Sequence, residues 1–444
     1  MATFFDDIGL QVPTVLLPAP GVDLKKWAVV ACDQYTSEPA YWQRVRKFAG
    51  SAPSTLNITL PEILLEAPGL AGRIAAINRT MRRYVAEGVL REQKPGLVLV
   101  DRRTVHAKSR KGMLAALDLE RYDFRKGSQT LIRATEGTIL ARIPPRVRIR
   151  KNASLELPHI MVLIDDPERT VIEPLFKRRP AKLYDTDLML GAGHVKGYLV
   201  DDPAALSRAH QALLRLADRG RFAKKYGARG KGVLLYAMGD GNHSLATAKT
   251  IWETLKSGAK DKDAVMRHPA RFALVELVNV HDPGLEFEPI HRVVFDTDPD
   301  ALIKAMGAFF GGDFSVRAMK GRAEALQAAR KCRGACHCIP FSAGKAFGVI
   351  SVGRPKLTLE VATLQSFLDQ YLAKNKQAKI DYIHGGDVVA SLSAQRRAIG
   401  FYLPPMDKSD LFKTVILDGA LPRKTFSMGE ASEKRFYLEC RKIA

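Results

Sequence analysis

The stretch YAMGDGNHSLATAK, residues 236–249, joins an apolar run to a helical one. The run GVLLYAMG at 232–239 is continuous and has the length of a buried strand. Apolar residues then recur at helical spacing and would share one face, at Leu245, Ala248, Ile251, Trp252 and Leu255. The pattern therefore predicts a strand, a tight turn at 239–244 and a helix over 244–258.

The turn contains groups that suit the binding of an anion. The first backbone N–H groups of a helix have no partner within it, and the helix dipole favours negative charge there. Gly239 and Gly241 permit close backbone approach and positive φ angles. Asp240 can hold a metal ion or accept a proton, and His243 can act as an acid, a base or a hydrogen-bond donor to phosphate.

The same turn also has a plainer interpretation. Asp and Asn commonly form strand-to-helix turns, and Asn242 or Ser244 would then only cap the helix. The stretch is not a dinucleotide fingerprint because the third glycine is absent. It is not a Walker loop because no Gly-Lys-Ser/Thr follows. The spacing alone leaves both interpretations open.

The chain is strongly basic, with 69 Lys and Arg against 47 Asp and Glu in 444 residues, a formal net charge of +22. Such a charge attracts nucleic acid, nucleotides and phosphorylated metabolites alike, or reflects only solvated faces. With 46% hydrophobic residues the chain should be folded rather than disordered. We see no apolar run long enough to span a bilayer and no signal peptide at the start, so we expect a cytoplasmic protein without a membrane partner.

Five cysteines are too few and too unevenly spaced for a disulfide framework. Three of them cluster in CRGACHC, as Cys332, Cys336 and Cys338. Thiolates beside His337 are typical of zinc chemistry, but the second short-spaced pair of a structural zinc site is missing. We expect free thiols between a helix end and a strand start, with metal binding as the alternative.

Strand-like and helix-like segments alternate without a regular period, which indicates an α+β or mixed α/β fold. The length predicts two or three domains, and we place a core at 1–290 and a C-terminal α+β portion at 291–444. Strands are expected at 27–32, 96–105, 112–124, 157–166, 270–280, 346–353 and 356–362, and helices at 60–88, 203–227 and 300–310.

Several segments together resemble the uncharacterised family catalogued as domain of unknown function 1015. In chain order they are WAVVACDQYTSEPAYW, DLERYDFRKGSQTLIRATEGTILARIPPR, LELPHIMVLIDD, GDGNHSLATAK and DPGLEFEPIHRVV, with a weaker ending at LPRKTFSMGEASEKRFYL. The resemblance supplies a family without a settled activity.

A more distant resemblance concerns the turn itself. Many members of that family carry Asp-Gly-His-His-Arg, which is similar to the Asp-Gly-x-His-Arg turn of ParB and sulfiredoxin-like proteins. Asp240, Gly241 and His243 match this turn, while Asn242 stands where many relatives have His and Ser244 where most have Arg. The resemblance implies a ParB/sulfiredoxin-like core, elaborated by N- and C-terminal α+β parts, whose turn and following helix bind nucleotide phosphates.

That superfamily includes free-serine kinases, CTP-dependent DNA-binding proteins and sulfiredoxin. Sulfiredoxin chemistry is excluded because the turn has no cysteine. The missing arginine would be a bidentate phosphate ligand, so another cation must replace it. The candidate cations are Lys249, Arg292 and Lys424.

Other polar segments would complete a phosphotransfer site if they converge. Glu136 in IRATEGT matches the acidic residue of a His-Glu pair in relatives and would orient or deprotonate a substrate hydroxyl, unless it only caps a helix. His291 follows an apolar strand and would contact phosphate. Substrate groups would be bound by Arg133 and Thr135 beside Glu136, and by Asp33, Gln34 and Tyr35 at a strand end.

These observations favour a nucleotide-dependent phosphotransferase that uses ATP or ADP with magnesium, Asp240 being the metal ligand. The expected substrate is a small hydroxy acid, first free serine or O-phosphoserine. One alternative is a nucleotide- or nucleic-acid-binding protein of the ParB type without catalysis, although no DNA-binding module is evident. Another is a metal-dependent hydrolase that uses Asp240, His243, His291 and His281. The expected phosphate ligands are Gly239, Gly241, Asn242, Ser244, Lys249, His291, Arg292 and Lys424.

Overall fold

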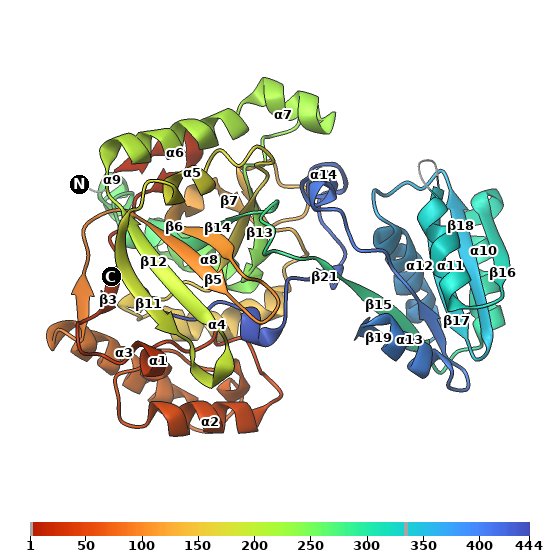
Figure 1. Cartoon of the computed structure of the whole chain (residues 1–444), viewed down its shortest axis with the longest axis horizontal. Coiled ribbons are helices and arrows are strands. Elements are labelled where there is room, and N and C mark those ends of the chain that lie inside the picture. Colours follow the sequence, from red (N-terminus) through yellow and green to blue (C-terminus); the bar gives the residue numbers. More distant parts are fainter. Residues whose placement is uncertain (1–2, 333–335) are drawn as a thin grey trace. The chain divides into compact units, whose positions relative to one another are not determined.

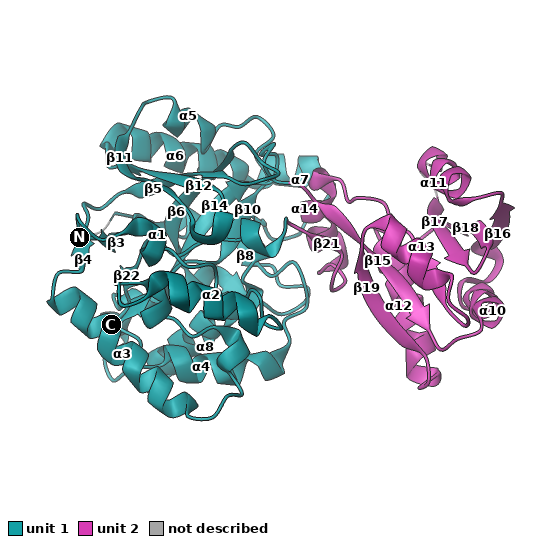
Figure 2. Ribbon diagram, turned by 60° about the horizontal axis from the view of Figure 1, so that its bottom comes forward, with its two compact units in different colours: residues 1–285, 429–444 teal, residues 286–428 magenta. Residues whose placement is uncertain are grey.

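The computed structural model describes residues 3–332 and 336–444, which form two compact units (Figure 2). Unit 1 comprises Met1–Leu285 together with Gly429–Ala444, and unit 2 comprises Glu286–Met428. The sequence placed the boundary near 290 and all later residues in one portion. In the structure the last segment lies with unit 1, because its residues pair with strands and loops from the first half of the chain.

A large mixed sheet runs through unit 1 (Figure 1). In spatial order its strands are β11 (Ala181–Asp187), β12 (His194–Val200), β5 (Leu97–Arg103), β6 (Arg110–Asp118), β14 (Phe272–Asn279), β10 (Met161–Ile164), β13 (Tyr236–Asp240), β8 (Ile132–Arg133) and β7 (Tyr122–Asp123). The pairing is parallel between β14 and β10 and along β13, β8 and β7, and antiparallel between the other neighbours. At one side β2 (Leu10–Gln11) pairs with β6 and with β1 (Phe4–Phe5).

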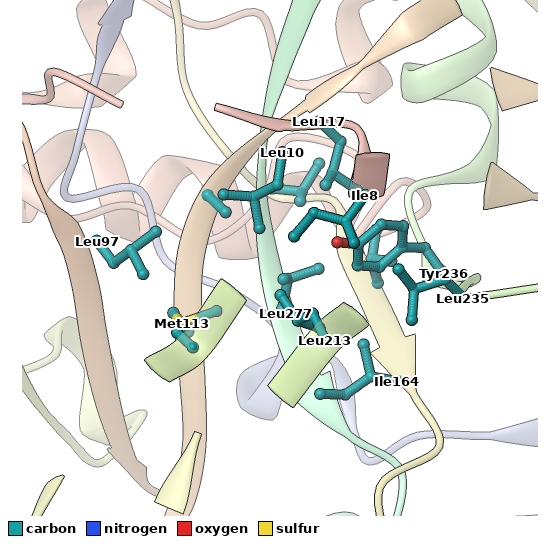
Figure 3. Close-up of a cluster of buried hydrophobic side chains, with 14 of the residues drawn as sticks. Ile8, Leu10, Leu97, Met113, Leu117, Ile164, Leu213, Leu235, Tyr236 and Leu277 are labelled. Atoms are coloured by element: carbon teal, nitrogen blue, oxygen red, sulfur yellow. The ribbon is translucent and has the colours of Figure 1, made fainter. Parts of the chain in front are cut away.

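The two faces of this sheet belong to separate apolar cores. Along β5, Leu97 and Leu99 enter one core, whereas Val98 and Val100 enter the other. An extended strand that is buried on both faces requires this period of two, and such strands read as continuous apolar runs in the sequence. Figure 3 shows the first core, in which strand side chains lie with Leu213 of helix α6 (Pro203–Leu216).

Helices cover both faces of the sheet. Residues of α6 and of α8 (Asn242–Gly258) belong to the first core, and residues of α2 (Pro39–Ala49) and α3 (Leu70–Ala86) belong to the second. Figure 1 shows α6 on one side of the sheet and α2 and α3 on the other. Shorter helices of unit 1 are α1 (Leu24–Trp27), α4 (Ile143–Arg150), α5 (Glu173–Phe176), α7 (Arg219–Tyr226) and α9 (Lys262–Val265).

Two small sheets complete unit 1. The strand β3 (Leu16–Pro18) pairs with β4 (Leu90–Glu92), and β9 (Leu155–Glu156) pairs with β22 (Arg441–Lys442). Because β22 lies near the end of the chain, this second pair holds the last segment in unit 1.

Unit 2 is built on an antiparallel sheet of its own. Its strands follow the order β16 (Phe314–Met319), β18 (Ala346–Gly353), β17 (Cys336–Ala343), β20 (Ile399–Phe401), β15 (Glu288–Phe295) and β19 (Lys379–His384), and β21 (Phe426–Ser427) also pairs with β15. The helices are α10 (Pro299–Phe310), α11 (Arg322–Lys331), α12 (Glu360–Lys374), α13 (Gly386–Ser393) and α14 (Lys408–Asp418).

The strand-turn-helix unit is present as expected, and the mixed α/β class is confirmed. The prediction of a strand at 356–362 is wrong, because α12 begins at Glu360. The apolar residues that alternate there lead into a helix with a buried face. The segment 27–32 is not a regular strand, because Trp27 ends α1 and Val30 makes only an isolated bridge to Phe436.

The helix expected at 203–227 is divided into α6 and α7. Asp218 begins the second helix, where its side chain accepts the N–H of Arg221 at 2.7 Å. Within the described residues, we find no helix that combines the length and the apolar character needed to cross a membrane.

Candidate functional site

Gly241 turns the chain from β13 into α8. Its φ of 79° lies in the left-handed region, and an added Cβ would lie 3.0 Å from the Cα of Ile160. Gly239, in contrast, lies within β13 and has no positive φ. Across the described chain, the backbone N–H groups of Asn242 and His243 have no acceptor. Two donors therefore remain for a ligand at the start of α8.

Asp240 ends β13 and forms an ion pair with a lysine from the end of the chain. Its Oδ2 lies 3.0 Å from Nζ of Lys434, and its Oδ1 accepts the N–H of Gly241 at 2.8 Å. Burial acts to raise the pKa of Asp240, but Lys434 and the Gly241 N–H outweigh it, so this pKa lies below its ordinary value. Asp240 is therefore ionised at neutral pH and holds a cation at the turn.

His243 lies in the first turn of α8 and is neutral at physiological pH. Burial, followed by the charges of Arg146 and Arg142, lowers its pKa to about 4, while Asp33 acts in the opposite direction. Its Nε2 accepts the N–H of Ile139 at 3.2 Å. A neutral imidazole that accepts at Nε2 carries its hydrogen on Nδ1, so His243 offers an N–H donor without adding a charge.

The segment after β8 covers the start of α8. Nδ2 of Asn242 donates to the carbonyl oxygen of Glu136 at 3.2 Å and to Oγ1 of Thr138 at 3.1 Å. Oγ1 of Thr135 donates to the carbonyl oxygen of Met238 at 2.6 Å. The structure thus brings Glu136 and Thr135 to the turn, and Asn242 anchors this segment instead of capping the helix.

The polar loop that contains Asp33 is linked to the turn by hydrogen bonds. The backbone N–H of Cys32 donates to the Tyr437 hydroxyl, which lies 2.9 Å from His159, and His159 contacts Ser244. The side-chain amide of Gln34 donates to Oδ1 of Asp33 at 3.0 Å. Glu62, in the single-turn helix η3 (Glu62–Leu64), forms an ion pair with Arg146 of α4. Burial raises the pKa of Glu62 despite Arg146, and Asp33 raises it further. Charges of both signs, from Asp33, Arg142 and Arg146, therefore act on His243.

Tyr35, which we expected to bind substrate, is fixed against α2. Its ring stacks on Tyr41 with centroids 3.6 Å apart, and its carbonyl oxygen accepts the indole N–H of Trp42 at 3.2 Å. Its φ of 51° is unusual for a residue other than glycine. These contacts shape the loop and do not involve the turn.

A histidine that the sequence pattern did not single out connects three segments at the site. Nε2 of His159 lies 2.8 Å from Oγ of Ser244, and its Nδ1 lies 2.9 Å from the hydroxyl of Tyr437. The Tyr437 hydroxyl also accepts the backbone N–H of Cys32 at 3.0 Å. Ser244 is thus bonded to His159 and does not cap α8.

The segment at 434–438 holds these loops together. The backbones of Arg435 and Tyr437 pair with residues 29–31 through N–H···O bonds of 2.8 Å. The side chain of Arg435 donates from Nε to the carbonyl oxygen of Pro158 at 3.0 Å. The C-terminal segment therefore positions both the Asp33 loop and the loop that carries the histidine.

Buried carboxylates fix Arg435 in turn. Its guanidinium pairs with Glu276 and with Glu439, the latter at 2.5 Å. Tyr184 donates its hydroxyl to the same Glu439. Both carboxylates are almost fully enclosed, with 1% and 0% exposure. Leaving such a buried charge without its partner is strongly unfavourable, so this network fixes the segment rigidly.

Two predicted ligands of unit 1 are engaged away from the turn. Nζ of Lys249 donates to the carbonyl oxygen of Leu119 at 2.9 Å and lies 2.6 Å from Glu253 on the same helix. Arg133 donates to backbone carbonyl oxygens, including that of Thr130 at 2.8 Å, and burial lowers its pKa to about 10. Both side chains hold backbone segments in place.

The remaining predicted ligands belong to unit 2. Arg292 is fully buried on β15, where it donates to Gln365 at 3.2 Å and to the carbonyl oxygens of Ile290, Arg423 and Lys424. Nδ1 of His291 accepts the N–H of Leu403 at 3.0 Å, and burial and Arg292 lower its pKa to about 4. The Lys424 side chain is exposed. All three residues belong to unit 2, whereas the turn belongs to unit 1.

Among the described residues, Asp240 belongs to no group of neighbouring metal ligands. Of the residues described, only Cys332, Cys336 and Cys338 form a close group of three or more His, Cys, Asp or Glu ligand atoms. Free thiols were expected there, but Cys332 and Cys338 form a disulfide, and Cys336 is free. Of the other ligands considered for a hydrolase, His281 pairs with Asp165, and His291 belongs to unit 2.

The protein-family models include one, described as "Protein of unknown function (DUF1015)", that matches residues 16–404. The chain belongs to this family. A search of the curated proteins finds no match. The resemblance drawn from the quoted segments is therefore confirmed, and it carries no activity with it.

Solved structures with a loose likeness include one titled as a free serine kinase in complex with AMP, with 9% identity, a TM-score of 0.37 and coverage of 74% of this chain and 92% of that chain. A conserved hypothetical protein from Pyrococcus furiosus has 11% identity, a TM-score of 0.37 and coverage of 73% and 94%. SbnI with a C-terminal truncation, from Staphylococcus aureus, has 9% identity, a TM-score of 0.33 and coverage of 71% and 83%. We draw no conclusion about residues or activity from likenesses at this level.

The sequence pattern missed several residues that surround the turn. Each of them lies in a loop or a short helix that is far from the turn along the chain. They are Glu62, Arg142, Arg146, His159, Lys434 and Tyr437. All but Glu62 had a signal that could have been used, because they stand in segments that we quoted for the family resemblance. Those residues are Arg142, Arg146, His159, Lys434 and Tyr437.

Proposed function

We propose that the chain is a nucleotide-dependent phosphotransferase that acts on a small hydroxy acid. The observation that carries this proposal is the start of α8. There the N–H groups of Asn242 and His243 have no acceptor among the described residues, and Lys434 is held by the neighbouring Asp240. Backbone donors, a helix dipole and a fixed cation are what a phosphoryl group in transfer requires, because its charge spreads over the equatorial oxygens.

Free serine is the first substrate to test, because the turn resembles that of a superfamily that includes free-serine kinases. A serine molecule carries an ammonium and a carboxylate besides its hydroxyl. Asp33, held by Gln34, offers a carboxylate to the ammonium. Arg142 is exposed and near His243, so it offers a guanidinium to the carboxylate. Charges of both signs at one site fit a zwitterion better than a simple anion.

In the proposed reaction the substrate hydroxyl oxygen attacks the terminal phosphorus of the nucleotide. The bond from this phosphorus to the bridging oxygen breaks, and the shortened nucleotide leaves with the electron pair. The hydroxyl proton passes to a carboxylate, for which Glu136 is our first candidate because its segment is anchored to Asn242. Nδ1–H of His243 would donate to the phosphoryl oxygens.

Magnesium would enter with the nucleotide rather than be held by a ring of protein carboxylates. Both oxygens of Asp240 already have partners, and Glu62 is paired with Arg146. A carboxylate of the turn region would share a magnesium ion that is bound mainly to the phosphates. Such shared coordination through one or two carboxylates is usual for this ion, which would neutralise charge between the phosphates.

Phosphorus NMR of the protein with magnesium, serine and either ATP or ADP tests the proposal. A new phosphomonoester signal is expected with the wild type, and with a control His106→Ala variant, because His106 is exposed outside the site. His243→Ala should reduce the rate of its appearance by about a hundredfold. If the folded wild type gives no such signal while the nucleotides stay intact, serine kinase activity is rejected.

A further inference from the structure

Four groups form one hydrogen-bonded chain that ends at the start of α8. The backbone N–H of Cys32 lies 3.0 Å from the Tyr437 hydroxyl, which lies 2.9 Å from Nδ1 of His159. Nε2 of His159 lies 2.8 Å from Oγ of Ser244. Tyr437 is 1% exposed, so water does not compete for its hydroxyl. Because every link is short, the direction of one hydrogen fixes the directions of the others.

A backbone N–H can only donate, and this fixes the first link of the chain. The Tyr437 oxygen accepts from Cys32, so its own hydrogen must go elsewhere. The Cys32 thiol does not compete as a strong acceptor, because burial and the charge of Asp33 raise its pKa to about 12 and keep it protonated. Nδ1 of His159 is the remaining acceptor within reach. The tyrosine therefore donates to His159.

An imidazole that accepts at Nδ1 carries its hydrogen on Nε2 when it is neutral. His159 consequently donates to Oγ of Ser244. The hydroxyl hydrogen of Ser244 has no acceptor among the residues that the structure describes. It is left as a donor in the first turn of α8, like the N–H groups of Asn242 and His243, which have no acceptor in the described chain.

We infer that His159 is a positioning residue that turns the Ser244 hydroxyl into a fixed donor to phosphate oxygens. The inference rests on the proposed phosphotransfer function and deepens it. The arrangement of Ser244, His159 and Tyr437 resembles a nucleophilic triad, but each hydrogen bond has the opposite donor and acceptor. His159 gives a hydrogen to the serine oxygen, so it does not accept the proton that a nucleophile must lose.

Calorimetric titration with inorganic pyrophosphate tests the role of the serine hydroxyl. Ser244→Ala should weaken binding about tenfold, because a hydrogen bond to a charged group is lost. His159→Leu should weaken it by a similar factor. His159→Gln keeps an N–H at the position of Nε2 and should bind within about twofold of the wild type. Circular dichroism of each variant shows whether it is folded.

Nitrogen NMR of the free wild-type protein tests the direction of the hydrogens without any ligand. The His159 ring should show the tautomer with hydrogen on Nε2, and Tyr437→Phe should mix the two tautomers. A ring with hydrogen on Nδ1 would overturn the inference. So would pyrophosphate binding that is unchanged in Ser244→Ala or His159→Leu, although the proposed function would survive that result. Absence of pyrophosphate binding by the folded wild type would overturn both.

Discussion

The turn at 239–244 and the His291–Arg292 pair on β15 look alike in sequence, since each places polar residues next to an apolar strand. In the structure they differ in what their donors do. The turn leaves the N–H groups of Asn242 and His243 without acceptors in the described chain. Arg292 instead donates to the carbonyl oxygens of its own unit and is 0% exposed.

This difference shows when a cationic side chain next to a strand can bind a ligand. It can do so only if the backbone carbonyl oxygens nearby do not take up its N–H donors. The loop that contains Arg423 and Lys424 leaves carbonyl oxygens without N–H partners, and Arg292 satisfies them. At the turn the reverse holds, because the start of a helix leaves N–H groups without acceptors. One region therefore stabilises the fold, and the other remains available for an anion.

Replacing Arg292 should give the largest effect on stability. Arg292→Met removes the partner of several buried carbonyl oxygens, so unit 2 should lose roughly 3 kcal/mol or more of its free energy of unfolding. Urea unfolding measures this loss, and Arg317→Ala, on an exposed strand position of the same unit, should change it by less than about 0.5 kcal/mol. A stable Arg292→Met variant with lost phosphotransfer would reverse our assignment of the two regions.

Replacing Lys434 should give the largest effect on activity in a protein that still folds. Lys434→Met removes the cation beside Asp240, and we expect phosphotransfer to fall about a hundredfold. Without Lys434 the pKa of Asp240 should also rise, since burial is then opposed mainly by the N–H of Gly241. Rates measured by phosphorus NMR should be unaffected in Lys424→Met, a lysine of unit 2. Equal rates in wild type and Lys434→Met would remove this lysine from the site.

The pKa of His243 should depend on the arginines around it. Proton NMR should give a pKa of about 4, and Arg142→Ala should raise it, whereas Arg148→Ala on the exposed side of α4 should not. Because the folded pKa lies below the unfolded value near 6.5, this histidine costs stability as the pH falls from about 6.5 to 4. His243→Asn should lessen that loss. An unchanged pKa in Arg142→Ala would place this arginine away from the turn.

Replacing Lys249 should give the smallest effect. Its ion pair with Glu253 is partly exposed, so Lys249→Ala should lower the free energy of unfolding by about 1 kcal/mol or less. Thermal unfolding measures this change. The phosphotransfer rate should stay within about twofold of wild type, because this lysine is bonded to Leu119. A large loss of rate with normal stability would return Lys249 to the list of phosphate ligands.

The sequence was sufficient to predict the β13–α8 unit, because local periodicity and the glycine at 241 define a turn whatever surrounds it. It also indicated Glu136 and Asp33 as candidate site residues, and their role stays a prediction. It could not supply the cation at the turn. Lys434 reaches Asp240 only because Arg435 is bound to buried carboxylates, which is a matter of packing between distant segments.

The link between His159 and Tyr437 shows the same limit. These residues are 278 positions apart, and no sequence pattern around either one predicts contact with the other. The start of α12 shows a different limit, because a few alternating residues at 356–362 fit a strand and a helix equally well until their burial is known.

The return of the chain to unit 1 has a consequence for synthesis on the ribosome. Asp33, His159 and His243 emerge early, then the whole of unit 2 is made, and only afterwards do Lys434 and Tyr437 become available. During that interval the nascent first unit has its sheet but lacks the segment that aligns its polar loops. The site can therefore be assembled only in a chain whose translation has passed through the intervening unit.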